Sequence, residues 1–431
     1  MTKKLIVFSA DAMVTDDLEH FKTLPGYRKY LAGGSEISRV KSVYPTITYP
    51  CHATMCTGVW PKTHGISGNL EFLPGTPPPI PWLWDRKWNL CPDDIFFEAK
   101  KAGLSTAAVF WPTTGNHPAI DYLIDEYWPQ GEGDTDEAAF RRMGSDDRMI
   151  EIFKRHNSGK RPRRHPDMDY AVISCTCDIL REYQPDVLFL HPANIDSYRH
   201  GWGVFNDHVR MGVDETDAWI GQIMETLRDI GLLEKTNFVL TSDHGQMDIT
   251  RVINLNVLLR ERGLIDCDSE GKVVSWRAWC LSGGMSCQVH LKDPQDRKLY
   301  GEVYALLQEL RDAEVYGISQ VFTAEELKDK EQVCGSYSFM VETDGYTSFG
   351  DSWRRPLIKT FDTSDYRYGH ATHGYLPEKG PWPMMLCKGP DFAENVVIPE
   401  GRLVDQAPTF AKLLGIPLPL AEGKAIDEIL R

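Results

Sequence analysis

The sequence lacks any long hydrophobic run, and no window approaches the roughly 18 apolar residues of a membrane-spanning helix. The first apolar run, in MTKKLIVFSADAM, stops at Asp11 and predicts a strand and no signal peptide. An excess of positive charge is also missing, since the formal net charge is −15. That charge argues against a broad surface for nucleic acid or an anionic membrane. A small anionic substrate is still compatible with it, provided that metals or local cations receive the anion.

The ten cysteines lack the regular spacing of a small disulfide-rich domain. We therefore expect reduced thiols and a cytoplasmic protein. Cys175 and Cys177 form a C-x-C pair, but no second pair at zinc-finger spacing accompanies them. We expect both to be buried packing residues.

What the 431 residues do contain is a series of buried-strand patterns alternating with helical patterns. Continuous apolar runs that alternate with helices predict an α/β fold, with a mostly parallel central sheet and helices on both faces. Apolar residues at helical spacing predict helices over 213–234, from about Asp405, and near 299–313. The expected strands are KLIVFSAD, STAAVFWP, DVLFLHPANID, NFVLTSDH and PMMLCKGPDF.

Residues 255–368 have a different character, with short β-like runs broken by Gly, Asp and Ser and one helical pattern. We interpret this region as an inserted, smaller α+β cap subdomain. Residues 1–254 and 369–431 would then form the metal-binding catalytic α/β core.

Polar residues follow several of the expected strands, which is where open α/β sheets collect ligands. A single aspartate in such a place is usually a turn former or a helix cap, so the joint pattern carries the argument. Carboxylate and imidazole together suit zinc, with manganese or iron as alternatives. Six such ligands suffice for two divalent ions, which can activate a nucleophile and hold a leaving oxygen. The six candidates are Asp11, Asp196, His200, Asp243, His244 and His373.

The order of the motifs resembles the alkaline phosphatase superfamily, in its nucleotide pyrophosphatase/phosphodiesterase (type I phosphodiesterase) branch. The matching segments run over nearly the whole chain: SAD, YPTITYPCHATMCTGVWPKTHGI, FWP, NIDSYRHGWG, TSDHGQMD, HATHGY, GPDF and DQAPTFAKLLGIPLP. The resemblance implies a hydrolase of phosphodiester or phosphoanhydride bonds. Its substrate would be a small phosphate compound, for example a nucleotide.

The resemblance also selects one threonine, Thr48, as the catalytic nucleophile. Pro50 suits the first turn of a helix that runs toward Thr57, which places Thr48 at or next to the helix N-terminus. Backbone N–H groups and the helix dipole favour a phosphoryl oxyanion there. A threonine hydroxyl is a poor nucleophile at neutral pH, so a metal must lower its pKa. The alternative is that Thr48 is only a helix cap.

By the same resemblance, one ion would be held by Asp11, Asp243, His244 and Thr48, and would activate the nucleophile. The second would be held by Asp196, His200 and His373, and would stabilise the leaving group and then supply the hydrolytic water. The implied course is attack by Thr48, a phosphothreonine intermediate, and hydrolysis of that intermediate.

Substrate contacts are less well defined by the sequence. Cys51 stands where the family usually has an asparagine whose amide donates to a phosphoryl oxygen, and a thiol is a weak donor. Tyr49 follows the nucleophile and is expected to stack on a base or cover an apolar group. Trp111, Trp202 and His191 are further candidates for this surface.

Other functions compete with a diesterase. A phosphonate C–P hydrolase of the phosphonoacetate hydrolase type also uses threonine and two zinc ions, and a phosphomonoesterase comes third. A sulfatase is disfavoured because the sequence has no Cys-x-Pro-x-Arg segment. The non-enzymatic alternative is a metal- or nucleotide-binding protein with a degraded site. The sequence leaves the natural substrate, the metal and the oligomeric state open.

Overall fold

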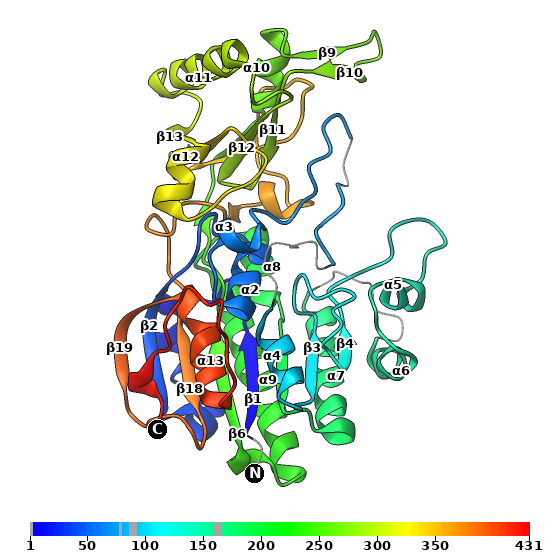
Figure 1. Ribbon diagram of the computed structural model, residues 1–431, viewed down its shortest axis with the longest axis vertical. Helices are drawn as coiled ribbons and strands as arrows, with labels where there is room; N and C mark the ends of the chain where they lie inside the picture. The colour runs from blue at the N-terminus through cyan, green and yellow to red at the C-terminus, as the bar shows by residue number, and fades with distance from the viewer. Residues whose placement is uncertain (1–2, 77–79, 86–92, 158–164) are drawn as a thin grey trace.

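The computed structural model describes residues 3–76, 80–85, 93–157 and 165–431. Figure 1 shows an α/β core, with both chain termini near its base, and a smaller part of mixed helices and strands above it. The helix labelled α2 lies at the upper end of the large sheet, close to the smaller part (Figure 1).

An eight-stranded sheet forms the middle of the core. Its strands are β1 (Lys4–Ser9), β2 (Ser35–Lys41), β3 (Thr106–Val109), β4 (Tyr122–Ile124), β5 (Val187–Leu190), β6 (Thr236–Thr241), β18 (Met385–Lys388) and β19 (Val397–Arg402). They are arranged in the order β19-β2-β18-β6-β1-β5-β3-β4. Every neighbouring pair is parallel except the two that β18 forms with β2 and β6. The predicted mostly parallel sheet is confirmed, and all five expected strand segments lie in it.

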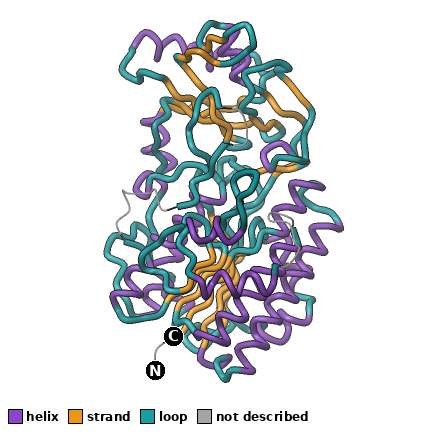
Figure 2. Tube along the Cα trace, turned by 90° about the vertical axis from the view of Figure 1, so that its right-hand side faces the viewer, coloured by secondary structure: helices purple, strands orange, loops and turns teal. Residues whose placement is uncertain are grey.

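Helices cover both faces of this sheet, because successive side chains of a strand point to opposite faces. Ile6 and Phe8 of β1 join a core that includes α6 (Asp147–His156), α7 (Asp167–Tyr183) and α9 (Asp207–Asp229). Leu5 and Val7 join the opposite core, with α2 (Thr48–Thr57), α4 (Ile95–Lys101) and α13 (Gln406–Leu414). Figure 2 shows the strands of the large sheet between helices on both sides.

The long helix predicted over 213–234 begins earlier and ends earlier than the apolar pattern indicates. The side chain of Asn206 accepts hydrogen bonds from the backbone N–H of His208 at 2.9 Å and of Val209 at 3.2 Å. Such an N-cap satisfies the free donors of the first turn, so α9 starts at Asp207. At the other end the chain leaves the helix at Ile230, and Gly231 takes a φ of +71°. The apolar stripe marked the buried face of the helix and missed its polar first turn.

The smaller part has its own antiparallel sheet, formed by β11 (Ala278–Ser282), β12 (Ser286–Leu291), β14 (Phe339–Thr343) and β13 (Ile318–Thr323) in that order. Helix α11 (Arg297–Asp312) packs Leu299 and Val303 into a core shared with this sheet. A separate three-stranded sheet joins β8 (Arg251–Ile253) to β15 (Thr347–Phe349) and β16 (Ile358–Lys359). The predicted limits of the cap subdomain, 255–368, stay a prediction. Strand β8 lies just before residue 255 and pairs with two strands inside that range.

None of the described helices is both long and apolar enough to cross a membrane. Nine cysteines lie in the described part of the chain, and all nine are free thiols. Cys175 and Cys177 lie on α7 and are both buried, as expected for packing residues.

One buried carboxylate, that of Glu342 on β14, joins the smaller part to segments that flank the expected catalytic residues. The hydroxyl of Tyr44 donates to Glu342 Oε2 at 2.9 Å, and the backbone N–H of Leu376 donates to Oε1 at 3.1 Å. Lys379 Nζ lies 3.0 Å from Oε1. Tyr44 precedes Thr48 by four residues and Leu376 follows His373 by three. The Glu342 carboxylate therefore ties both segments to the smaller sheet.

This carboxylate should make stability depend on pH. Burial raises the pKa of Glu342 to about 7 from an ordinary value of 4.5, although Lys379 and its hydrogen bonds oppose the rise. The folded protein then binds the proton more tightly than the unfolded chain, so the free energy of unfolding should fall between about pH 4.5 and pH 7. This pKa shift corresponds to a loss of about 3 kcal/mol in the free energy of unfolding, and the loss is complete above about pH 7. Urea unfolding of the wild type and of Glu342→Gln across this pH range measures the slope.

The neutral amide of Glu342→Gln should remove this part of the pH dependence. Glu400→Gln, on exposed β19, is the matched control and should keep the wild-type slope. If the free energy of unfolding of the wild type and of Glu342→Gln changed with pH in the same way, Glu342 would not be the source of the slope.

Candidate active site

The expected site residues gather at one edge of the large sheet, where three neighbouring parallel strands end. Asp11 lies two residues after β1, His191 follows β5 directly, and Asp243 lies two residues after β6. The carboxyl ends of parallel strands are the usual ligand-binding edge of such a sheet. Helices α2 and α8 (Asn194–Trp202) add further side chains to this edge. Four segments far apart in the sequence therefore meet there, because α8 follows β5 almost directly.

Thr48 is the first residue of α2, a helix of ten residues. The first helical hydrogen bond runs from the N–H of Cys51 to the carbonyl of Ile47 at 3.1 Å, and Pro50 stands within the first turn. The Thr48 hydroxyl lies 3.2 Å from His244 Nε2. It is therefore at the positive end of a helix dipole and in contact with a candidate metal ligand.

Asp243 and His244 follow β6 and lie close to Asp11. His244 Nε2 is 3.2 Å from Asp243 Oδ2 and 3.6 Å from Asp11 Oδ1. The backbone N–H of Ala12 donates to Asp243 Oδ1 at 3.2 Å, which orients that carboxylate. Thr48, Asp11, Asp243 and His244 therefore lie close together, and their assignment to one metal ion stays a prediction.

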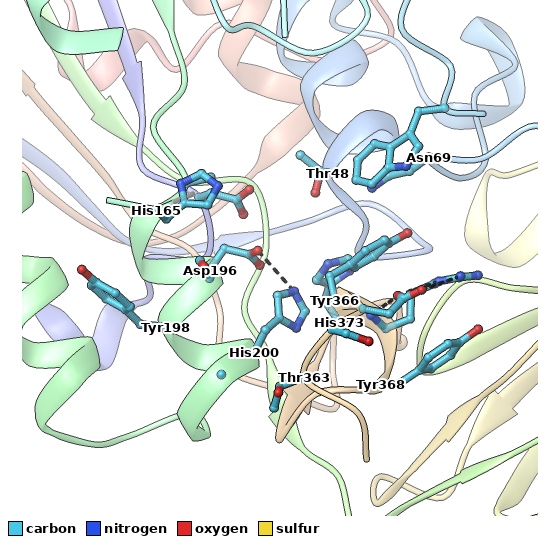
Figure 3. Close-up of a pocket in the computed structure, with 18 of the residues that line it drawn as sticks. Thr48, Asn69, His165, Asp196, Tyr198, His200, Thr363, Tyr366, Tyr368 and His373 are labelled. Carbon is cyan, nitrogen blue, oxygen red and sulfur yellow. Dashed lines mark hydrogen bonds and ion pairs between the residues drawn. The ribbon is translucent and has the colours of Figure 1, made fainter. Parts of the chain in front are cut away.

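A second group consists of Asp196, His200 and His373, whose candidate ligand atoms all lie within 4.8 Å of one another. Asp196 and His200 are four residues apart on α8, and His200 Nε2 is 3.2 Å from Asp196 Oδ2. His200 Nδ1 donates to the carbonyl of Ala371 at 2.7 Å, which leaves Nε2 to face the site. His373 follows the short strand β17 (Ala371–Thr372). Figure 3 shows Thr48 facing these three side chains across a cavity.

The donor set fits metal ions on two counts. Several buried polar atoms form no hydrogen bond within the described residues, and four of them belong to these ligand sets: Asp11 Oδ1, Asp243 Oδ2, His200 Nε2 and His373 Nδ1. Asp243 Oδ2 and His200 Nε2 each have another candidate ligand at ion-pair distance, 3.2 Å away. A buried polar atom without a partner costs free energy, so such atoms usually receive a ligand, a water or an ion. The atoms are carboxylate oxygens and imidazole nitrogens, which are ordinary zinc ligands. A third close grouping joins Asp11, Asp196 and His244, so the two sets of ligands are neighbours.

The electrostatics agree with a site that needs cations. Burial raises the pKa of Asp11 well above its ordinary value, and the charges of Asp196 and Asp243 raise it further. Burial also opposes ionisation of Asp196, but the neighbouring imidazoles, led by His200, outweigh it and lower the pKa. Burial lowers the pKa of His373 well below its usual range, so its imidazole is neutral and able to bind a metal.

Two of the predicted substrate residues, His191 and Trp202, line the cavity. The main contact of His191 is with Asp11. Its Nε2 lies 3.1 Å from Asp11 Oδ2, opposite the oxygen that faces His244. Burial lowers the pKa of His191 to about 4, so the ring is neutral and orients Asp11 by hydrogen bonding. His52, which the sequence did not single out, packs against this ring at 4.2 Å between centroids. His52 Nδ1 lies 2.8 Å from the carbonyl oxygen of Thr48, so it supports the first turn of α2.

The other three predicted substrate residues are corrected by the structure, because none of them lines the cavity. Cys51 lies one turn into α2 on the side that faces the sheet, and its thiol is 3.1 Å from Ser42 Oγ in the buried core. Trp111 is fully buried and packs edge-on against His52. Tyr49 is also fully buried and contacts Trp82, which lines the cavity in its place. These three side chains pack in the protein core and hold α2 in place.

Asn69 occupies a position that the sequence analysis missed. It lines the cavity, and its Oδ1 accepts a hydrogen bond from the N–H of Tyr49 at 3.0 Å. This contact holds the side chain beside Thr48 and leaves its amide nitrogen as the donor. Figure 3 shows Thr48 and Asn69 on the same side of the cavity. The amide donor expected at position 51 therefore has a counterpart at position 69, on a loop that folds back onto α2.

The cavity has a volume of about 1020 Å³, enough for a substrate larger than the scissile phosphoryl group. Aromatic side chains form much of its wall, including Trp82, Tyr127, Trp128, Tyr366 and Tyr368. Trp82 and Trp128 pack edge to face, with ring centroids 5.4 Å apart. Such walls suit planar or apolar groups.

A comparison with family models matches residues 5–376 to the model described as type I phosphodiesterase / nucleotide pyrophosphatase. Among curated proteins, the chain is 25% identical to the human ectonucleotide pyrophosphatase/phosphodiesterase family member 1 over 264 residues, which is 60% of this chain and 25% of that protein. It is 25% identical to a venom phosphodiesterase of Macrovipera lebetinus over 260 residues, or 57% of this chain and 26% of that protein. An ectonucleotide pyrophosphatase/phosphodiesterase of Caenorhabditis elegans is 23% identical over 419 residues, covering 96% of this chain and 47% of that protein. The chain thus spans between a quarter and a half of the length of these relatives.

Solved structures give the same fold over the full length. Murine ectonucleotide pyrophosphatase/phosphodiesterase 5 superposes with a TM-score of 0.67 at 20% identity and covers 100% of both chains. An inactive variant of the same mouse protein, in complex with AMP, gives a TM-score of 0.68 at 20% identity and also covers 100% of both chains.

Proposed function

The chain belongs to the type I phosphodiesterase / nucleotide pyrophosphatase family, and on that premise we propose that it is a metal-dependent hydrolase of phosphodiester or phosphoanhydride bonds. The observation that carries the proposal is the position of the Thr48 hydroxyl. It stands at the N-terminus of α2, 3.2 Å from His244, and faces a convergent set of carboxylates and imidazoles. A hydroxyl in such a place is suited to attack a bound phosphoryl group.

Two divalent ions fit the donor atoms, with zinc first and manganese or iron as alternatives. Asp11, Asp243, His244 and Thr48 would hold one ion, and Asp196, His200 and His373 the other. When bound, such ions lower the pKa of a hydroxyl or water and neutralise charge on phosphoryl oxygens. His191 orients the candidate ligand Asp11 through its Nε2. His200 is itself oriented, because its Nδ1 donates to the carbonyl of Ala371.

The reaction proceeds in two displacements at phosphorus. The Thr48 oxygen, having given its proton to solvent, forms a bond to phosphorus while the bond to the leaving oxygen breaks, and an alcohol leaving group takes up a proton from solvent. The amide of Asn69 and the backbone N–H of Thr48 donate to the phosphoryl oxygens and stabilise the charge that develops there, whereas the N–H groups of Tyr49 and Cys51 are already bonded. Water then attacks the phosphothreonine, which releases the phosphate monoester and restores the Thr48 hydroxyl.

The substrate class is a small phosphate compound with at least one bulky substituent, of which a nucleotide is the leading example. The size and aromatic walls of the cavity support this proposal. The mouse structure described as a complex with AMP supports a nucleoside monophosphate as the transferred group.

A substrate panel tests the function. The purified chain, with added zinc or manganese, is assayed on bis-p-nitrophenyl phosphate, p-nitrophenyl phosphate, nucleoside triphosphates, nucleotide sugars and phosphonoacetate. We expect kcat/KM for diesters to exceed that for monoesters by at least about tenfold, which is about 1.4 kcal/mol of transition-state binding. The reason is that the second ester group gains contact with the cavity wall, which a simple monoester cannot reach.

Each competing function has its own outcome in this panel. Equal or better turnover of monoesters would replace the proposal with a phosphomonoesterase. Cleavage of the C–P bond of phosphonoacetate would favour the phosphonate hydrolase. Metal binding without turnover of any compound would leave a binding protein with a degraded site.

A further inference from the structure

Trp202 is an exposed aromatic side chain at the wall of the same cavity. It is the last residue of α8, two positions after His200, and 59% of its surface is exposed. It lines the cavity and stacks on His208 of α9, with ring centroids 4.2 Å apart and planes within 16° of each other. One face of the indole is therefore covered by an imidazole.

The backbone around this stacked pair is held in place. Gly203 ends α8 with a φ of +98°, a conformation that favours glycine. The side chain of Asp248 accepts the N–H of Val204 at 2.8 Å, and Asn206 Nδ2 donates to the carbonyl of Gly203 at 2.7 Å. Asn206 also caps α9, which fixes the start of the helix that carries His208. These bonds hold the backbone on both sides of the stacked pair, and the stack itself covers one face of the indole and leaves the other open.

The direction of the proposed reaction places this pair on the leaving-group side. In an in-line displacement the leaving oxygen departs opposite the attacking one. Thr48 is the attacking group, and Asp196, His200 and His373 face it across the cavity. Asp196 and His200 belong to α8, so a leaving group that passes them meets the end of that helix. In Figure 3, Tyr198 of α8 and Asn69 lie on opposite sides of the view.

We propose that Trp202, backed by His208, is a leaving-group subsite that stacks a planar aromatic ring, such as the base of a second nucleoside. The proposal rests on the proposed function, because it assigns the leaving group of that reaction. The transferred group would occupy the opposite wall, near Asn69 and Trp82. The chain then prefers diesters that carry a ring on both sides of the phosphorus. Stacking of a base on an aromatic side chain is sequence-tolerant, so the identity of the second base matters little.

The test uses two substrates that differ only in one base. Both contain thymidine 5′-phosphate, esterified either to the 3′-oxygen of thymidine or to the 3′-oxygen of the same deoxyribose with hydrogen in place of the base. Only turnover that releases thymidine 5′-phosphate is counted, so the leaving sugar oxygen is the same in both. We expect the wild type to favour the base-bearing leaving group about tenfold in kcat/KM, mainly through KM.

Trp202→Ala should bring this ratio close to one while turnover of the abasic substrate stays near that of the wild type. Trp202→Phe should keep part of the preference, because a smaller ring remains. Phe205→Ala is the matched control: Phe205 is 60% exposed, lies three residues from Trp202 and does not line the cavity. It should keep the full ratio.

Bis-p-nitrophenyl phosphate separates failure of the subsite from failure of the function. Turnover of this diester, with a wild-type ratio near one or a ratio that Trp202→Ala leaves unchanged, would overturn the subsite and leave the function standing. No turnover of any diester would overturn the function, and the subsite with it.

Discussion

Replacing Thr48 with alanine is expected to lower kcat by a factor on the order of 10³ or more while both metal ions stay bound. The size follows from the loss of the nucleophile itself, since no other described hydroxyl contacts His244 in the same way. In the proposed site Thr48 would contribute one ligand to an ion that three other side chains hold, so its loss should leave the ion bound. Steady-state kinetics on bis-p-nitrophenyl phosphate and metal analysis of the same sample measure both quantities.

Two variants make this result specific to the hydroxyl at position 48. Thr48→Ser retains a hydroxyl at the helix N-terminus and should keep part of the rate. Thr57→Ala removes a hydroxyl from the other end of α2, where it donates to the carbonyl of Ala53, and should leave the rate near that of the wild type. A Thr48→Ala protein with near-normal turnover would remove the nucleophile assignment and the covalent mechanism.

Removing a candidate metal ligand is expected to lower metal content and activity together. Asp243→Ala and His200→Ala should each reduce the content from about two ions per chain toward one, because each belongs to a different ligand set. Activity should fall by about 10²-fold or more, since an in-line displacement needs both oxygens stabilised. Metal analysis after dialysis and kcat/KM on a diester are the measurements.

Thermal unfolding gives an independent measure of the loss of bound metal in these two variants. A ligand that binds only the folded protein stabilises it by mass action, so a chelator should lower the unfolding temperature of the wild type more than that of either variant. Asp229→Ala, an exposed carboxylate at the end of α9, is the control and should behave as the wild type. Full metal loading in both Asp243→Ala and His200→Ala would count against the assignment.

The sequence determined the fold class and the set of candidate ligands. Continuous apolar runs such as KLIVFSAD and NFVLTSDH are typical of strands buried on both faces of a sheet, and their carboxyl ends carry Asp11, Asp243 and His244. Because parallel strands end at one edge, adjacency of β1 and β6 was enough to bring these residues together. The i, i+4 spacing of Asp196 and His200 likewise follows from one turn of helix.

The tertiary structure decided which side chains around that set face the cavity. Tyr49 and Cys51 follow the nucleophile in sequence, but the rotation of α2 turns both into packed cores. Asn69 reaches the start of α2 only because a loop folds back across it, and its contact is with the backbone N–H of Tyr49, which no sequence pattern marks. His191 faces Asp11, and Trp202 stacks on His208, through the packing of β5 against β1 and of α8 against α9. Local sequence specifies periodicity and strand ends, whereas the rotation of a helix and the path of a loop are set by contacts between segments far apart in the chain.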